Sequence, residues 1–113
     1  MIVGNFGSSP EELWAWFRLP DSDGEVELRL MNRMELKVLS ENTDLAAEAR
    51  LIAKSYFRDF RNLKDRHGAD IPNTEENRAI IMTTLEIGPF VTRKLISGSG
   101  WFAEGKGGSG SAS

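Results

Sequence analysis

The sequence predicts an α+β domain, mostly helical, in which an N-terminal β-hairpin packs on three or four α-helices. The hairpin is indicated by Glu25 to Leu30, where polar and apolar side chains alternate without interruption. Helices are indicated by apolar residues that recur at spacings of three and four between Leu45 and Leu63. Further helix starts are marked by Asn32 and by Asn73-Thr74. A chain of 113 residues has the length of one domain with a single modest core.

Residues 1–12 are expected to form a loose N-terminal arm, because two glycines, two serines and a proline fall between Gly4 and Pro10. The segment LWAWFRL at 13–19 is the first strand of the hairpin, and the turn residues at 20–24 connect it to the second strand. In a strand, alternate side chains share a face. This alternation separates Trp14 and Trp16 from Leu13, Ala15 and Phe17, and it directs Val26, Leu28 and Leu30 toward the core.

Two helices are predicted after the hairpin. Asn32 and Glu35 have the spacing of a capping box, so a short helix should run from Arg33 to about Ser40. We expect Met34, Val38 and Leu39 to face the core. A second helix of about five turns should begin after Asn42-Thr43-Asp44. Its inward face would hold Leu45, Ala49, Ile52, Tyr56, Phe60 and Leu63.

The second helix should end near residues 63–66, at a polar turn. Gly68 lies where a chain leaving a helix commonly needs a positive φ, and the aspartates around it can bond to nearby backbone. Pro72 favours an extended Ile71. Asn73-Thr74-Glu75-Glu76 then predicts a helix start, with Asn73 or Thr74 as the cap and Glu76 at the spacing of a capping box from Asn73.

The third helix is expected to start at Glu75 and to bury Ile80, Ile81 and Leu85. Gly88-Pro89 should interrupt it, because proline removes a backbone donor and clashes with the preceding turn. A final short helix would bury Phe90, Val91, Leu95 and Ile96. Residues 13–97 are thus the predicted domain, and residues 98–113 have the Gly/Ser-rich composition of a flexible C-terminal tail.

Composition argues against several classes of partner. The chain has 14 basic and 17 acidic side chains, a net charge of −3, which gives no global attraction to nucleic acid or anionic lipid. It has no cysteine, and no apolar run approaches the ~20 residues that span a bilayer. We therefore expect neither a nucleic-acid nor a membrane partner.

No residue pattern predicts a catalytic, cofactor or metal site. His67 is the only histidine, so it lacks the partners that metal binding or nucleophilic catalysis needs. Residues 21–25 resemble the opening of a calcium loop, but the glycine comes too early and Asn32 stands where the closing glutamate belongs. We expect a protein that is not an enzyme and has no cofactor.

Two groups of side chains are candidates for binding. A basic patch, diluted by Asp59, Asp65 and Asp70, could contact phosphate; its members are Arg58, Arg61, Lys64, Arg66 and His67. The aromatic residues are the better candidates for a protein partner, since aromatic side chains anchor interfaces and a small domain has limited room for them. These residues are Trp14, Trp16, Phe17, Trp101 and Phe102, although Trp14 or Trp16 could equally lie in the core and Trp101-Phe102 could fold back on the domain.

The polar turn resembles a motif of the tail assembly chaperones of long-tailed bacteriophages and prophages. The family pattern D-x-x-G-x-x-I/L-P-x-T-x-E-N is matched by Asp65, Gly68, Ile71, Pro72, Thr74, Glu76 and Asn77. The resemblance covers the middle and C-terminal half well and the hairpin loosely. It departs at Phe60 and Leu63, where the family would have a tryptophan followed by a small residue.

The resemblance implies a non-enzymatic helper that binds the long helical tape-measure protein and brings tail-tube subunits to it. Such a protein acts in the host bacterial cytoplasm, is absent from the mature virion and can also self-associate. It is often made in two lengths by a −1 ribosomal shift, which codons for Glu104-Gly105-Lys106 would permit. The alternatives are a small DNA- or RNA-binding regulator that uses the patch from Arg58 to Arg66, and an enzyme subunit without active-site residues of its own.

Overall fold

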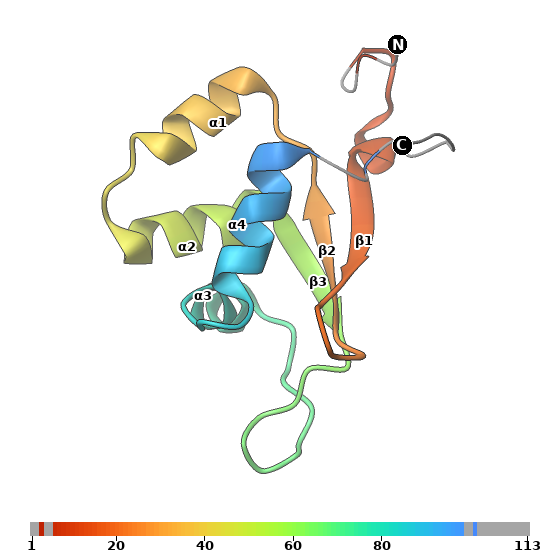
Figure 1. The fold of residues 1–113 in the computed structure, drawn as a ribbon, viewed down its shortest axis with the longest axis vertical. Coiled ribbons are helices and arrows are strands. Elements are labelled where there is room, and N and C mark those ends of the chain that lie inside the picture. The colour runs from red at the N-terminus through yellow and green to blue at the C-terminus, as the bar shows by residue number, and fades with distance from the viewer. Residues whose placement is uncertain (1–2, 4–5, 99–100, 102–113) are drawn as a thin grey trace.

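The structure is a computed structural model that describes residues 3, 6–98 and 101. In this part of the chain a three-stranded antiparallel sheet of order β1-β2-β3 is combined with four α-helices that lie on one side of it (Figure 1). The strands are β1 (Trp14–Arg18), β2 (Glu25–Arg29) and β3 (Phe57–Arg61), and the helices are α1 (Arg33–Ser40), α2 (Leu45–Ser55), α3 (Glu75–Met82) and α4 (Gly88–Ser97). The predicted α+β class is confirmed.

The hairpin of β1 and β2 has the predicted facing, and the structure adds its register. Trp16 pairs with Glu27 and Phe17 with Val26. Val26 and Leu28 are fully buried under the helices, because they point to the face that α2, α3 and α4 cover. Ala15 and Phe17 pack against the same core, whereas Trp14 and Trp16 lie on the opposite, outer face of the sheet.

The predicted five-turn helix was wrong in its second half. Helix α2 ends at Ser55, and residues 57–61 form β3, which pairs with β2. The ladder has an irregularity opposite Glu27 and Leu28, where Arg58 is the extra residue of a β-bulge. The bulge gives Phe57 and Phe60 the same inward face at a spacing of three. That spacing matches a helical period, so the sequence alone predicts a continuing helix here.

The helix starts follow the predicted capping chemistry. The Asn32 side chain accepts from the backbone N–H of Glu35, and Glu35 accepts in return from the N–H of Asn32, each at 2.9 Å. Before α3, Thr74 is the cap and accepts from the N–H of Asn77 at 3.0 Å. The capping box from Asn73 to Glu76 was therefore wrong, because Asn73 uses its side chain to bind β3.

The polar turn confirms the conformation predicted for Gly68, which has a φ of +81°. One Oδ of Asp65 accepts from the backbone N–H groups of His67 and Ala69. The predicted helix leading into this turn is absent, since β3 precedes it.

The α3–α4 connection also differs from the prediction. Helix α3 ends at Met82, and α4 starts at Gly88, two residues before the expected Phe90. Pro89 fits the first turn of α4, where no backbone donor is needed. Gly88 itself has no room for a side chain, because an added Cβ would lie 2.3 Å from the carbonyl oxygen of Met82.

The core lies between the sheet and the helices, and most of the predicted inward residues reach it. Six do not: they are 58–88% exposed and were predicted as buried, namely Met34, Val38, Leu45, Ile80, Leu85 and Ile96. The physical reason is that the helices form a single layer. Helix α1, for example, packs on the core through Leu36 and Leu39, so Met34 and Val38 point away.

The boundary of the N-terminal arm lies earlier than expected. A 3-10 turn, η1 (Pro10–Leu13), precedes β1, and Leu13 is buried. Glu12 accepts from the backbone N–H of Ser9, which closes this turn. Residues 10–12, which were expected to belong to the loose arm, thus form part of a regular turn.

Candidate partner-binding surfaces

The outer face of the sheet is built from alternating tryptophan and arginine side chains. The guanidinium carbon of Arg58 lies 4.3 Å from the centre of the Trp14 ring, and that of Arg61 lies 3.7 Å from the Trp16 ring. β3 supplies both arginines to this face because of its bulge. Trp14 and Trp16 are partly buried, and neither belongs to the set of side chains packed on the core.

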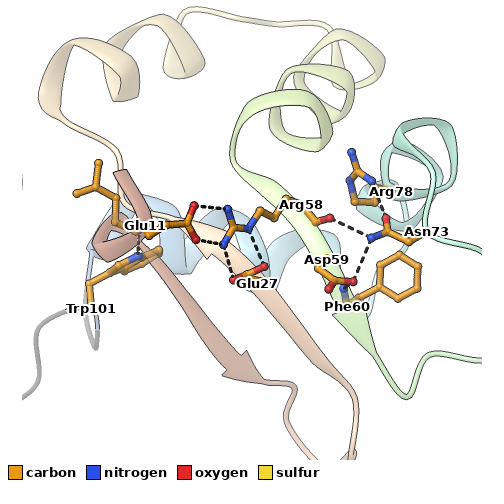
Figure 2. A network of polar contacts seen from close by, with 9 residues as sticks. Glu11, Glu27, Arg58, Asp59, Phe60, Asn73, Arg78 and Trp101 are labelled. Atoms are coloured by element: carbon orange, nitrogen blue, oxygen red, sulfur yellow. Dashed lines mark hydrogen bonds and ion pairs between the residues drawn. The ribbon is translucent and has the colours of Figure 1, made fainter. Parts of the chain in front are cut away.

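Arg58 is held by two carboxylates (Figure 2). Its Nε and one terminal nitrogen donate to Glu27 at 2.8 and 3.0 Å, and its two terminal nitrogens donate to Glu11 at 3.1 and 2.9 Å. These hydrogen bonds raise the pKa of Arg58 above its usual range and lower that of Glu11. The guanidinium is thus a fixed structural cation that joins η1, β2 and β3.

On the other side of β3, Asn73 is bound to the strand (Figure 2). Its side-chain amide donates to the carbonyl oxygen of Arg58 and to Asp59, both at 3.0 Å. Arg78 donates to Asn73 and also to the carbonyl oxygen of Ala53 at the end of α2. This edge of the sheet is therefore covered, and the start of α3 is fixed to it.

The basic patch predicted for phosphate is largely neutralised. Arg61 lies 3.6 Å from Glu25, and Lys64 pairs with Asp70. Together with the two carboxylates on Arg58, these pairs leave little free positive charge on the sheet. His67 is exposed in the turn, as expected.

Trp101 lies in the core and is 7% exposed. Its ring centre is 4.6 Å from that of Phe17, and its Nε1 donates to the carbonyl oxygen of Leu13 at 2.8 Å. This is the folded-back arrangement considered for Trp101-Phe102, and it makes Trp101 unsuitable as a freely exposed anchor. Phe102 lies outside the described residues. Among the five aromatic candidates, Trp101 packs against Phe17 on the inner face of the sheet. Trp14 and Trp16 lie together on the outer face of the sheet.

A groove that the sequence did not predict lies between α1, α2 and α4. It has a volume of about 660 Å³. Its lining is largely apolar, with Leu36 and Leu39 from α1 and Ile96 from α4, and Thr92 also lines it on α4. The charged side chains at its rim are Arg33, Lys37 and Glu48.

A second hollow of about 430 Å³ continues the first one along α4. The two share Glu48, Thr92 and Ile96, so they form one surface, which we call the helix-face groove. The continuation adds Leu45 at the start of α2, Leu85 in the α3–α4 connection and Arg93 on α4. No residue of the sheet lines either part.

The helix-face groove explains most of the unexpected exposure. Of the six apolar residues predicted as buried but found exposed, four line it: Met34, Leu45, Leu85 and Ile96. The sequence did contain a usable signal. Helix α1 has apolar residues at positions 34, 36, 38 and 39, which spread over more of its circumference than one buried stripe requires.

Other kinds of site find no support in the part of the chain that the structure describes. There, no group of three or more His, Cys, Asp or Glu side chains could hold a metal ion. Among the described helices, none combines the length and apolar character required to cross a membrane. Residues 21–24 form the turn of the hairpin, closed by the N–H of Leu19 bonding to the carbonyl oxygen of Gly24.

Comparisons of the chain with protein-family models, with curated proteins and with solved structures give no match. The geometry of these surfaces and the resemblance of the turn motif are therefore the grounds for inferring a function.

Proposed function

We propose that this protein is a phage or prophage tail assembly chaperone that binds the tape-measure protein and helps to recruit tail-tube subunits. The resemblance of the turn from Asp65 to Asn77 suggests the family. The observation that carries the proposal is the helix-face groove, which gathers exposed apolar side chains in the way that commonly marks a protein-interaction site.

The work of such a chaperone is to cover the apolar stripe of a long helix until the tail tube replaces it. This requires an apolar groove long enough to receive several turns of helix. The helix-face groove extends over two joined hollows, and its lining residues come from α1, α2, α4, the end of α3 and the α3–α4 connection. Exposed apolar side chains on rigid helices are suited to this kind of reversible binding.

Co-expression with the tape-measure protein encoded by a neighbouring gene tests the proposal. We expect a soluble complex that survives size-exclusion chromatography, whereas the tape-measure protein alone should aggregate. Failure of the parent protein to retain the tape-measure chain would refute the chaperone function. A tail-tube gene upstream and a very long helical gene downstream would support it independently.

The groove supplies a matched pair of variants for the same assay. Ile96→Asp places a charge in the shared wall of the two hollows, where the side chain is 59% exposed, so it should weaken the complex without unfolding the domain. Val38→Asp, on α1 but outside the groove and 60% exposed, is the control and should leave the complex intact. Equal retention by both variants would show that the partner binds elsewhere.

A further inference from the structure

We propose that the helix-face groove selects an amphipathic α-helix whose apolar stripe is flanked by acidic side chains, and that Arg33, Lys37 and Arg93 recognise those acids. The inference rests on the proposed function, since it specifies the chemistry of the partner segment. It also makes the groove testable without the partner itself.

The groove favours a helix over an extended peptide. Its lining residues come from helices and the link between two of them, and the backbone donors and acceptors of a helix are bonded within it. An extended peptide in this apolar groove would find few partners for its own N–H and C=O groups, and unpaired backbone groups are costly to bury. A helix satisfies these groups internally and presents only side chains.

The charges around the groove are mostly positive, although the chain as a whole carries a net charge of −3. Arg33, Lys37 and Arg93 are the cations among the lining residues, and Glu48 is the one acidic lining residue. Among the described residues, Arg33 and Arg93 make no ion pair. Lys37 has one, with Glu41 at 3.8 Å, in which both side chains are mostly exposed and so interact weakly. These cations remain available to a partner.

The spacing of the cations sets a pattern for the partner helix. Arg33 and Lys37 are four residues apart on α1, so they lie on the same side of the helix about 6 Å apart along its axis. A helix lying beside α1 would meet both cations with acidic residues at a spacing of three or four. Arg93 lies on α4 and lines the second hollow, so it would meet an acidic residue on the α4 side of the stripe.

Two designed peptides test this recognition with the full-length protein. Both are 21-residue helices with the same leucine stripe; one has glutamates and the other has lysines on both flanks. We expect the acidic peptide to bind at least about tenfold more tightly in low salt, and the preference should shrink as salt screens the exposed charges. Fluorescence anisotropy of labelled peptide measures both affinities.

Charge reversal assigns the recognition to the named residues. Arg33→Glu combined with Lys37→Glu should weaken binding of the acidic peptide by roughly tenfold and strengthen binding of the basic one, because two favourable ion pairs become repulsive. The matched control, Lys54→Glu combined with Arg66→Glu, changes the net charge equally at exposed residues outside the groove. It should leave both affinities unchanged, and circular dichroism verifies that both variants fold.

Several outcomes would overturn the inference. It would be contradicted if the two peptides bind equally, if neither binds, or if the two double reversals have equal effects. It would also be contradicted if the parent is a dimer that Ile96→Asp converts to a monomer and that the acidic peptide does not disrupt. The chaperone function can fail separately. If the protein selects the acidic peptide but does not retain the tape-measure protein, the chaperone proposal is refuted and this inference stands. If the protein retains the tape-measure protein and the Arg33 and Lys37 reversals do not change this retention, the chaperone proposal stands and this inference is refuted.

Discussion

Truncation of Trp101 to alanine should destabilise the domain, although the residue follows the last helix and precedes a Gly/Ser-rich segment. The indole is 7% exposed, so it buries most of its roughly 150–250 Å², which is equivalent to about 4–6 kcal/mol of favourable transfer energy. The ring contact with Phe17 and the hydrogen bond to Leu13 each add about 1 kcal/mol. The entropy cost of holding the chain beyond Gly98 offsets more than half of the total.

The expected net loss for Trp101→Ala is therefore about 2 kcal/mol, which corresponds to a decrease in Tm of roughly 8–16 °C for a domain of this size. Urea denaturation followed by far-UV circular dichroism measures it, because the substitution alters tryptophan fluorescence. Trp101→Phe is the matched control. It keeps an aromatic ring against Phe17 and loses the indole donor, but the carbonyl oxygen of Leu13 still accepts from the N–H of Leu30 at 2.8 Å, so the cost should stay near 1 kcal/mol.

A Trp101→Ala protein within about 0.5 kcal/mol of the parent would refute this reasoning, because that difference is smaller than the energy of one well-packed aromatic contact. It would also restore Trp101 as a candidate anchor for the partner. A clear loss of stability would direct binding experiments to the helix-face groove instead.

Three further substitutions have defined outcomes. Gly88→Ala should cost at least about 2 kcal/mol in urea denaturation, since its Cβ would clash with the backbone of Met82; an unchanged midpoint would contradict this. Burial raises the pKa of Glu35, but hydrogen bonds from Asn32, Tyr56 and Arg29 outweigh burial and lower the pKa. The ionised Glu35 therefore stabilises the fold above the normal glutamate pKa, and this stabilisation is lost as the pH falls through the lowered pKa. Glu35→Gln should then flatten the decrease in Tm between pH 6 and 3. Arg58→Lys should cost about 1–2 kcal/mol, because an ammonium cannot reproduce the fork that binds two carboxylates; a stability equal to that of the parent would show that charge alone suffices.

The hairpin and the helix starts could be predicted because their signals are local. Strict alternation at residues 25–30 and the Asn32 capping box each depend on a few neighbouring residues and on backbone geometry. The same holds for Gly68, whose positive φ follows from the turn it occupies. In these places local chemistry and the final fold agree.

β3 could not be predicted in the same way, because its bulge changes the period of the strand. Phe57 and Phe60 face inward and Arg58 and Arg61 face outward, each pair at a spacing of three. Without the pairing partner, this pattern cannot be distinguished from the continuation of α2.

The helix-face groove shows a different limit. Periodicity indicates which residues share a face of a helix, but whether another element covers that face depends on the tertiary arrangement. Ile96 has the correct spacing for a core residue of α4, and it is exposed because no described element covers that side of the helix. Four of the residues that were wrongly predicted as buried therefore line the candidate site.

The bulge in β3 also bears on how the length of this strand could change in evolution. If Asp59 were deleted, the remaining residues Phe57, Arg58, Phe60 and Arg61 would alternate inward and outward with the regular two-residue period of a strand. The deletion would remove the side-chain acceptor that binds Asn73 but would keep every inward phenylalanine and outward arginine in place. A relative with one residue fewer at this point could keep the same sheet, and an alignment of such chains should place its gap inside the strand.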